Sequence, residues 1–240
     1  MAALSRLLLS ILCLAPTALY AAENSAEVLV RALARAAPAL DRGVLGKAVG
    51  AMNCAVRGGL EPARRLAVID FSLPSSKQRL WIFDLERRRL LVEDHVAHGR
   101  GSGEERPTQF SNRLGSRQSS LGLFRTAETY YGNFGYSLRL DGLEPGINDL
   151  ARKRKIVIHA AEYVDPIWIH LKGGIGRSHG CPAVRPNIIN RVVENLKEGQ
   201  FLFSYYPDPR WLHQSLYLNC APDRVAAALG PLLGSHQAAR

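Results

Sequence analysis

The sequence predicts one mainly β domain with a few flanking helices. Short runs rich in β-branched and aromatic residues recur from residue 64 onward, and turns rich in Gly, Pro and Ser separate them. Helical periodicity is confined to three segments, at 26–57, 185–199 and 223–233. The apolar content of 47% and the charged content of 22% are those of an ordinary globular chain, which excludes a disordered or fibrous protein.

Residues 1–22 have the three-part pattern of a secretory signal peptide. Arg6 precedes an apolar run, and a small-residue stretch ends near Ala21 or Ala22. The run is shorter than the roughly 20 residues that a membrane-spanning helix needs, so removal is favoured over an uncleaved anchor. We therefore expect an exported protein, periplasmic or secreted to the cell envelope, which loses Cys13 with the signal peptide.

The remaining chain divides into three parts. Residues 23–62 form a helical segment that breaks at Pro38 and restarts at Asp41. Residues 63–206 form the main domain, and residues 207–240 form a C-terminal tail packed on it. Within the main domain the alternation and turn signals predict strands over 64–73, 78–86, 89–99, 121–132, 136–143, 154–161 and 200–206. A long loop rich in Gly, Ser and Arg occupies 99–120, and loops of that length are often functional.

The chain is basic, with a formal net charge of +10. This positive charge favours binding to an acidic or polyanionic surface, such as an envelope polymer or anionic lipid. The basic runs at 86–89 and 152–155 carry no interleaved stacking aromatics, so they indicate solvated strand ends. We expect no nucleic-acid partner.

Cysteine usage sets one thiol apart from the others. Without Cys13, three cysteines remain, and an odd count in an oxidising compartment leaves at least one thiol unpaired within the chain. Cys54 and Cys220 flank the main domain and are expected to form a disulfide, with two small buried thiols as the alternative. Cys181 is then the free cysteine.

The stretch "SHGC" around Cys181 has the residue types of a nucleophilic site. A cysteine attacks a carbonyl carbon as thiolate, so it needs a base within hydrogen-bond reach. His159, His170 and His179 lie upstream, and His159 is the best held because it ends a strand. The alternative is that His159 is a core histidine whose hydrogen bonds are satisfied within the protein and that has no catalytic role. The spacing of these three histidines and Cys181 matches no common zinc-binding pattern, so we expect neither a metal ion nor a cofactor.

Glycines around the cysteine suit a tight turn with exposed backbone donors. Gly176 and Gly180 have no side chains, so the backbone can turn tightly there. The N–H groups of His179, Gly180 and Cys181 are expected to converge on an oxyanion, where one such donor contributes about 3 kcal/mol. Arg177 and Arg185 bracket the turn. Each could lower the thiol pKa or hold a substrate carboxylate.

Two of these stretches resemble the catalytic signature of a known family. "IVIHAAEYV" followed by "GRSHGCPAV" is similar to the YkuD-type L,D-transpeptidases, and more closely to their second YkuD-like branch. "VAHGRGSG", "FSNRLGSRQSSLGLF", "ETYYG" and "SLRLDGLEPGIND" also fit that branch in order, so the resemblance covers residues 65–206. It implies a YkuD-like β-sandwich or barrel and makes residues 63–206 the catalytic domain.

The resemblance also implies roles for individual residues. Cys181 corresponds to the nucleophile and His159 to the base, and the Ala160 carbonyl would orient the imidazole. His179 and Gly180 would line the oxyanion region. Substrate-binding positions are expected at Ser178, Arg177, Tyr130, Tyr131 and Arg185, with Arg113 and Arg117 as further carboxylate clamps unless they are simply solvated.

The sequence departs from the family pattern at two places. Ala183 stands where the broad family has Arg or Asn, and Arg185 follows two residues later. The span from His159 to Cys181 is lengthened by "DPIWIHLKGG" at 165–174, which suggests a small lid or an altered acceptor groove.

The implied reaction acts on peptidoglycan stem peptides. Cys181 would attack the carbonyl between an L-centre and a D-amino acid, release D-alanine, and hold the acyl group as a thioester. An amine of a second stem peptide would then form a cross-link, whereas water would make the enzyme an L,D-carboxypeptidase or endopeptidase. Carbapenem-type β-lactams are the expected inhibitors and a monomer the expected state. A non-catalytic peptidoglycan-binding module remains the alternative, and a papain-like protease is disfavoured because its cysteine precedes its histidine.

Overall fold

The structure, a computed structural model, describes the backbone of residues 15–237 and the side chains of residues 25–230. Most of the predicted signal peptide lies outside these residues, and no side chain around its cleavage site is described. In the part of the chain that is described, no helix has both the length and the apolar character needed to cross a membrane.

Eight strands form one sheet in the order β3-β2-β1-β8-β4-β5-β6-β7. Neighbouring strands are antiparallel except for the parallel pairs β1–β8 and β6–β7. Their bounds are β1 (Arg65–Asp70), β2 (Leu80–Asp84), β3 (Arg89–Asp94), β4 (Gly122–Gly132), β5 (Gly135–Gly142), β6 (Val157–Ala160), β7 (Ala183–Val184) and β8 (Phe201–Tyr205). The mainly β fold class predicted from the sequence is confirmed.

The sheet curls until its two ends almost meet. The chain that continues from β3 forms a bridge from Ala97 to Ala183 in β7, at the opposite edge of the strand order. The Ala97 N–H donates to the Ala183 carbonyl at 2.9 Å. Because this contact joins the edges, the sheet is a nearly closed barrel and leaves little exposed strand edge.

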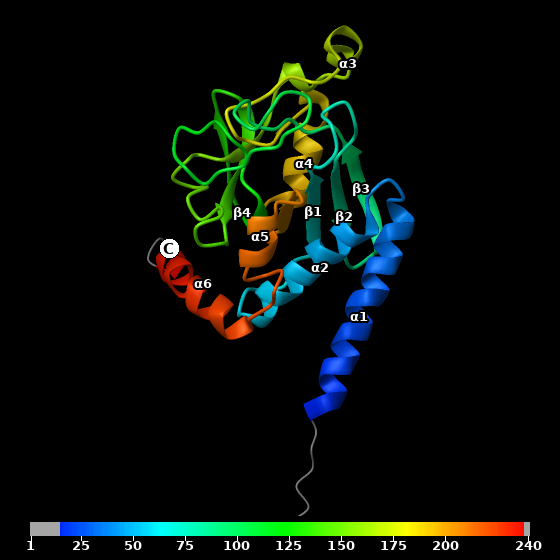
Figure 1. Cartoon of the computed structure of the whole chain (residues 1–240), viewed down its shortest axis with the longest axis vertical. Coiled ribbons are helices and arrows are strands. Elements are labelled where there is room, and N and C mark those ends of the chain that lie inside the picture. Colours follow the sequence, from blue (N-terminus) through cyan, green and yellow to red (C-terminus); the bar gives the residue numbers. More distant parts are fainter. Residues whose placement is uncertain (1–14, 238–240) are drawn as a thin grey trace, which may run out of the picture.

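Helices cover the sheet and extend from it (Figure 1). The central strands β1, β2 and β8 are buried at successive positions, so both of their faces are covered. α2 contacts β1, β4 and β8, while α4 contacts β1, β5 and β6. The bounds are α1 (Ala15–Ala36), α2 (Arg42–Arg57), the 3-10 helix η1 (Glu162–Val164), α3 (Ile167–Lys172), the 3-10 helix η2 (Pro186–Ile188), α4 (Ile189–Leu196), α5 (Pro209–Gln214) and α6 (Pro222–Gln237).

Two short helices were not expected from the sequence. α3 lies inside the inserted segment 165–174, and α5 begins in the tail after Asp208, whose carboxylate accepts the Trp211 N–H at 2.8 Å. Both are six residues long, too short to show helical periodicity. The strand expected at 89–99 is also shorter and ends at Asp94.

A disulfide joins the N-terminal helices to the tail. Cys54 in α2 and Cys220, just before α6, are bonded with their Cα atoms 5.5 Å apart. α6 also packs against α2. The end of α2 and the start of α6 are therefore held together, and Figure 1 shows these two helices next to each other.

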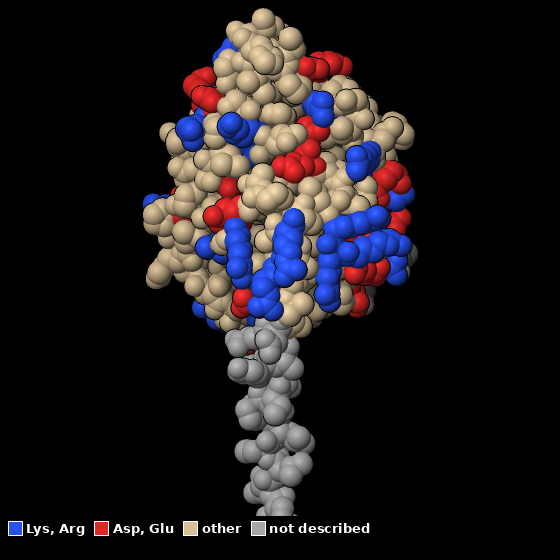
Figure 2. Space-filling model, turned by 90° about the vertical axis from the view of Figure 1, so that its right-hand side faces the viewer, with Lys and Arg blue, Asp and Glu red and all other residues tan. Residues whose placement is uncertain are grey.

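Positive side chains gather over the lower half of the face seen in Figure 2, on the side of β3 and α1. At the β2–β3 turn, Arg65, Arg87 and Arg89 surround the Asp84 carboxylate at 3.3–3.7 Å, which partly balances their charge. The run at 86–89 is thus the solvated turn between β2 and β3, as the sequence indicated.

Candidate active site

Among the described residues Cys181 is the free cysteine, and it lies partly exposed just before β7. Its Sγ lies 3.7 Å from the Lys155 carbonyl oxygen. Burial raises the pKa of Cys181, while the Val157 backbone N–H and the positive charge of Arg154 act in the opposite direction. The resting group is therefore a thiol, and it needs a base when it attacks.

His159 is the last residue but one of β6, which ends at Ala160, and it is buried. Its Nδ1 lies 2.8 Å from the Ala160 carbonyl oxygen. A carbonyl only accepts, so Nδ1 carries the proton and the neutral ring has its lone pair on Nε2. Burial lowers the pKa of His159, against the opposing effect of the Ala160 bond, which keeps the imidazole neutral and able to accept a proton.

The strand pairing brings the backbone of His159 next to the chain that follows Cys181. β6 and β7 run parallel with His159 opposite Ala183, two residues after Cys181. On the other side, the Ser178 N–H donates to the His98 carbonyl at 2.9 Å. The cysteine turn is therefore held between β6 and the segment that follows β3.

The turn itself corrects one expectation about the oxyanion donors. Gly180 has a φ of +123°, and its N–H donates to Ser178 Oγ at 3.0 Å, so it is not free for an oxyanion. Ser178 Oγ in turn donates to the Cys181 carbonyl at 2.6 Å. Among the described residues no acceptor binds the N–H of His179 or Cys181. These two donors remain for an oxyanion.

Ser178 also differs from its expected role. The residue is 4% exposed, and both of its side-chain bonds lie inside the turn. Its hydroxyl stabilises the backbone around Cys181 and does not point out of the turn. A Cβ at Gly180 would lie 2.8 Å from the Gln118 carbonyl oxygen, so the same turn requires glycine there.

The aromatic side chain next to the histidine is Phe134, and not Tyr130 or Tyr131. The rings of Phe134 and His159 lie 4.5 Å apart at 30°. Tyr131 is 82% exposed, and Tyr130 packs under the guanidinium of Arg139 at 4.5 Å. The sequence predicts a turn at "NFG" between two strands but gives no sign that Phe134 in this turn contacts His159.

The expected arginines have other partners. Arg185 forms a two-pronged ion pair with Asp94, at 3.0 and 2.5 Å, so it is not available as a carboxylate clamp. Arg177 Nη1 lies 2.7 Å from a carboxylate oxygen of Glu104. Arg113 and Arg117, the further clamp candidates, are exposed.

Arg154 is the cation near the thiol, and the sequence reasoning missed it. Its guanidinium donates to the Ser111 and Gln118 carbonyls, both at 2.5 Å, and to the Ser120 hydroxyl. It thereby holds the long loop 99–120 beside the site, and its charge lowers the pKa of Cys181. The run at 152–155 looked like a solvated strand end, and only the fold brings one of its members to Cys181.

The sequence matches the family model of the L,D-transpeptidase catalytic domain over residues 36–205. The chain belongs to this family. The match takes in α2 as well as the strands from residue 65 onward.

Solved L,D-transpeptidases resemble the structure at low sequence identity. The L,D-transpeptidase from Mycobacterium smegmatis is 13% identical, with 60% of each chain covered and a TM-score of 0.38. The one from Stackebrandtia nassauensis is 14% identical, with 69% of this chain and 68% of that chain covered and a TM-score of 0.37. LdtMt1 in complex with imipenem is 12% identical, with 60% of each chain covered and a TM-score of 0.38.

The chain spans about 60% of the length of the first of these structures. No curated protein matches its sequence.

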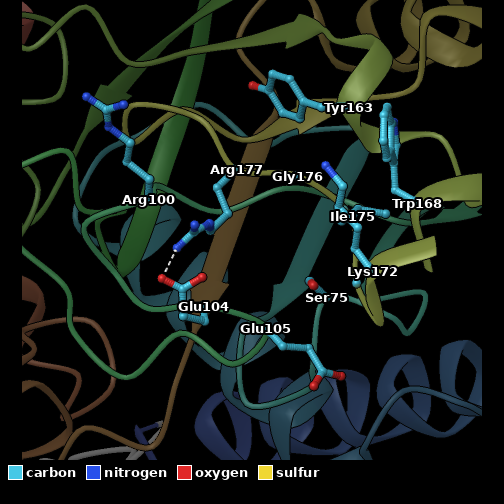
Figure 3. A pocket seen from close by; sticks show the side chains of 11 residues that line it. Ser75, Arg100, Glu104, Glu105, Tyr163, Trp168, Lys172, Ile175, Gly176 and Arg177 are labelled. Carbon is cyan, nitrogen blue, oxygen red and sulfur yellow. Dashed lines mark ion pairs between the residues drawn. The ribbon is translucent and has the colours of Figure 1, made fainter. Parts of the chain in front are cut away.

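This L,D-transpeptidase domain also has a cavity of about 610 Å³ beside the cysteine turn (Figure 3). Its lining comes from the β1–β2 loop, from the loop after β3, and from the chain between η1 and the cysteine turn, which includes the inserted segment. The residues are Ser75, Arg100, Glu104, Glu105, Tyr163, Trp168, Lys172, Gly174, Ile175, Gly176 and Arg177. Burial, and then the charge of Cys181, raise the pKa of Tyr163 to about 12. Tyr163, on the wall of the cavity, is therefore close to Cys181.

Among the described residues no three His, Cys, Asp or Glu side chains gather in a way that could hold a metal ion. His170 lies exposed on α3 and His179 is exposed on the turn. The zinc alternative weighed from the sequence thus has no ligand set in this part of the chain.

Proposed function

We propose that the protein is a peptidoglycan L,D-transpeptidase that works through a thioester on Cys181. The observation that carries this proposal is the hydrogen bond from His159 Nδ1 to the Ala160 carbonyl, at 2.8 Å, in the strand beside a free thiol. It leaves Nε2 as the acceptor in a neutral imidazole, which is the form that a thiol needs for activation. Membership of the L,D-transpeptidase family supports the choice of substrate.

In the acylation half-reaction, His159 takes the thiol proton as Cys181 Sγ bonds to the carbonyl carbon between an L-centre and a D-amino acid. The negative oxygen of the tetrahedral intermediate accepts the N–H groups of His179 and Cys181. The carbon–nitrogen bond then breaks, and the imidazolium returns its proton to the leaving D-alanine. The acyl group remains on sulfur as a thioester.

In the second half-reaction, an amine of another stem peptide attacks the thioester carbonyl. His159 takes the amine proton, the carbon–sulfur bond breaks, and the thiolate is protonated again. If water attacks instead, the same steps make an L,D-carboxypeptidase or endopeptidase. A cavity of about 610 Å³ beside the turn offers room for a second peptide, which favours transfer.

The disulfide between Cys54 and Cys220 supports an exported site of action, because such bonds persist in oxidising compartments. Together with the signal-like N-terminus, it supports a site of action in the periplasm or elsewhere in the cell envelope. Carbapenem-type β-lactams would acylate the same sulfur, because their strained carbonyl takes the place of the donor carbonyl.

The test is incubation of the purified protein with a disaccharide-tetrapeptide, followed by mass spectrometry of the products. We expect D-alanine and a cross-linked dimer, and neither with Cys181→Ala or His159→Ala. D-Alanine with tripeptide but no dimer would identify a carboxypeptidase. No release of D-alanine, together with equal binding of peptidoglycan by the wild type and by Cys181→Ala, would identify a binding module.

A further inference from the structure

Two buried side chains beside the cysteine turn have no part in the reaction described above. Arg79 and His98 are each 0% exposed, and Arg79 Nη2 lies 2.7 Å from His98 Nδ1. Arg79 also donates to the Val96 carbonyl from Nε and Nη2, at 3.1 and 2.9 Å, and to the Leu73 carbonyl at 2.8 Å. Burial lowers the pKa of Arg79 to about 9, so the guanidinium is still charged at neutral pH. Among the described residues no carboxylate forms an ion pair with it, so carbonyls and one imidazole hold a charge that is costly to bury.

The partners of His98 fix which of its ring nitrogens carries the proton. A guanidinium only donates, so Nδ1 accepts from Arg79 and carries no proton. Nε2 then carries the proton and donates to the Gly103 carbonyl at 3.3 Å. Burial, and then the charge of Arg79, lower the pKa of His98 to about 4, so the ring is neutral at neutral pH. His159 has the opposite arrangement, with its proton on Nδ1.

The backbone around His98 holds the cysteine turn. The His98 carbonyl accepts the Ser178 N–H at 2.9 Å, and the Arg100 N–H donates to the Ser178 carbonyl at 2.8 Å. Both backbone groups of Ser178 are therefore bound to the segment 98–100, while its hydroxyl donates to the Cys181 carbonyl at 2.6 Å. A shift of this segment would therefore also move the backbone that carries the nucleophile.

The His98 ring fixes the position of this segment from two sides. Nδ1 is bound to Arg79, the residue just before β2, and Nε2 is bound to Gly103 in the long loop. The Gly103 carbonyl also accepts from Arg177 Nη1 at 3.0 Å, one residue before Ser178. The ring thus connects the barrel, the long loop and the cysteine turn at one point.

We propose that His98 is a positioning residue for the acylation of Cys181. Its neutral ring, held between Arg79 and the Gly103 carbonyl, fixes the backbone of Ser178 and so directs the oxyanion donors of the turn. The ring takes no part in proton transfer, because both of its nitrogens are occupied. The inference rests on the proposed function and adds a residue that acts through the backbone without touching the substrate.

Two variants of equal shape isolate the hydrogen bond to Arg79. Asparagine and leucine side chains have the same shape, but only the asparagine oxygen can replace Nδ1 as an acceptor. We expect His98→Leu to lower the first-order rate constant of acylation by imipenem about ten- to a hundredfold, the effect of a small misplacement of the reacting groups. His98→Asn should recover most of this loss. The imipenem concentration that gives the half-maximal rate should change in neither variant, because no binding surface is altered.

Thr126→Val is the control for a merely structural effect. Thr126 makes two buried hydrogen bonds in β4, so its loss should lower the Tm as His98→Leu does and leave the acylation rate constant unchanged. A wild-type rate constant in folded His98→Leu would overturn the proposal. Equally low rate constants in His98→Leu and His98→Asn would also contradict it, because the acceptor for Arg79 would then have no effect.

A measurement on the wild-type protein tests the same contacts even where a variant does not fold. Long-range nitrogen–proton NMR of the protein labelled at histidine reports which ring nitrogen carries the proton. At neutral pH we expect the proton of His98 on Nε2 and that of His159 on Nδ1. A His98 ring with its proton on Nδ1, or on both nitrogens, would overturn the proposal.

The two arms separate this inference from the proposed function. If neither imipenem nor tetrapeptide acylates Cys181 in the wild type, the proposed function fails, and the NMR measurement still decides the contacts of His98. Normal acylation of the wild type with an unchanged rate constant in His98→Leu would sink the positioning role alone.

Discussion

Ser178→Ala is the substitution that tests the geometry of the cysteine turn most sharply. The serine hydroxyl accepts the Gly180 N–H at 3.0 Å and donates to the Cys181 carbonyl at 2.6 Å, in a site that is 4% exposed. Alanine removes both bonds and leaves the two backbone groups without a partner. The turn then loses the brace that directs the N–H groups of His179 and Cys181.

The expected magnitudes follow from these two bonds. A buried group left unsatisfied costs about 1–3 kcal/mol, so we expect the free energy of unfolding to fall by about 2 kcal/mol. For a chain of this size that corresponds to a fall in Tm of roughly 4–8 °C. Misalignment of one oxyanion donor lowers the acylation rate about a hundredfold.

Thr126→Val is the matched control. Thr126 Oγ1 donates to the Leu196 carbonyl at 2.5 Å and accepts the Gln200 N–H at 2.7 Å, and the residue is 2% exposed. It thus makes the same pair of bonds in β4, away from the cysteine. We expect a similar fall in Tm and an unchanged acylation rate.

The assay is the rate of covalent modification by imipenem, followed by intact-mass analysis beside thermal unfolding. Equal losses of rate in Ser178→Ala and Thr126→Val would show that the effect is general destabilisation. A normal rate in Ser178→Ala would refute the role of the turn in directing the donors.

Three further predictions concern the thiol, its cation and the disulfide. Because burial raises the pKa of Cys181, alkylation by iodoacetamide should be slow at neutral pH, and its rate should keep rising to a higher pH than for a free cysteine. Because burial lowers the pKa of His159, the imidazole is protonated only as the pH falls below about 6.5, so kcat/KM for acylation should stay constant down to that pH. A fast, pH-independent alkylation would mean a preformed thiolate instead. Arg154→Gln should raise the thiol pKa further and shift the alkylation profile to higher pH, and an unmoved profile would remove this residue from the site. Replacing Cys54 and Cys220 by Ser removes a cross-link between residues 166 positions apart and should lower the free energy of unfolding by up to about 5 kcal/mol, measured by denaturant titration. Acylation by imipenem should persist. An unchanged free energy of unfolding would contradict a stabilising role for the link between α2 and the tail.

The sequence predicted the elements that carry a long local pattern. Burial along a single segment leaves such a pattern in the sequence. It is seen in the apolar periodicity of α2 and in the β-branched runs of β1, β2, β4 and β8. Cys181 and His159 also stood out locally, one by the "SHGC" motif and one by its place at a strand end.

What the sequence missed depends on contacts between distant segments. Phe134 lies in the turn between β4 and β5, and its ring contacts that of His159, 25 positions later in the chain. Arg154 lowers the pKa of Cys181, and its guanidinium also donates to the Gln118 carbonyl of the long loop. The use of the Gly180 N–H by Ser178 depends on a single backbone angle, φ +123°, which residue types do not specify. Arg185 looked free because its partner, Asp94, lies 91 residues earlier in the chain.

The most direct measurement of the central claim is peptide mapping of the acyl-enzyme trapped with tetrapeptide at low pH. The wild-type protein should gain the mass of the donor minus D-alanine, on the peptide that contains Cys181, and His159→Ala should gain it far more slowly. An adduct on any other residue, or the same adduct in Cys181→Ala, would contradict the assignment of this sulfur as the acyl carrier.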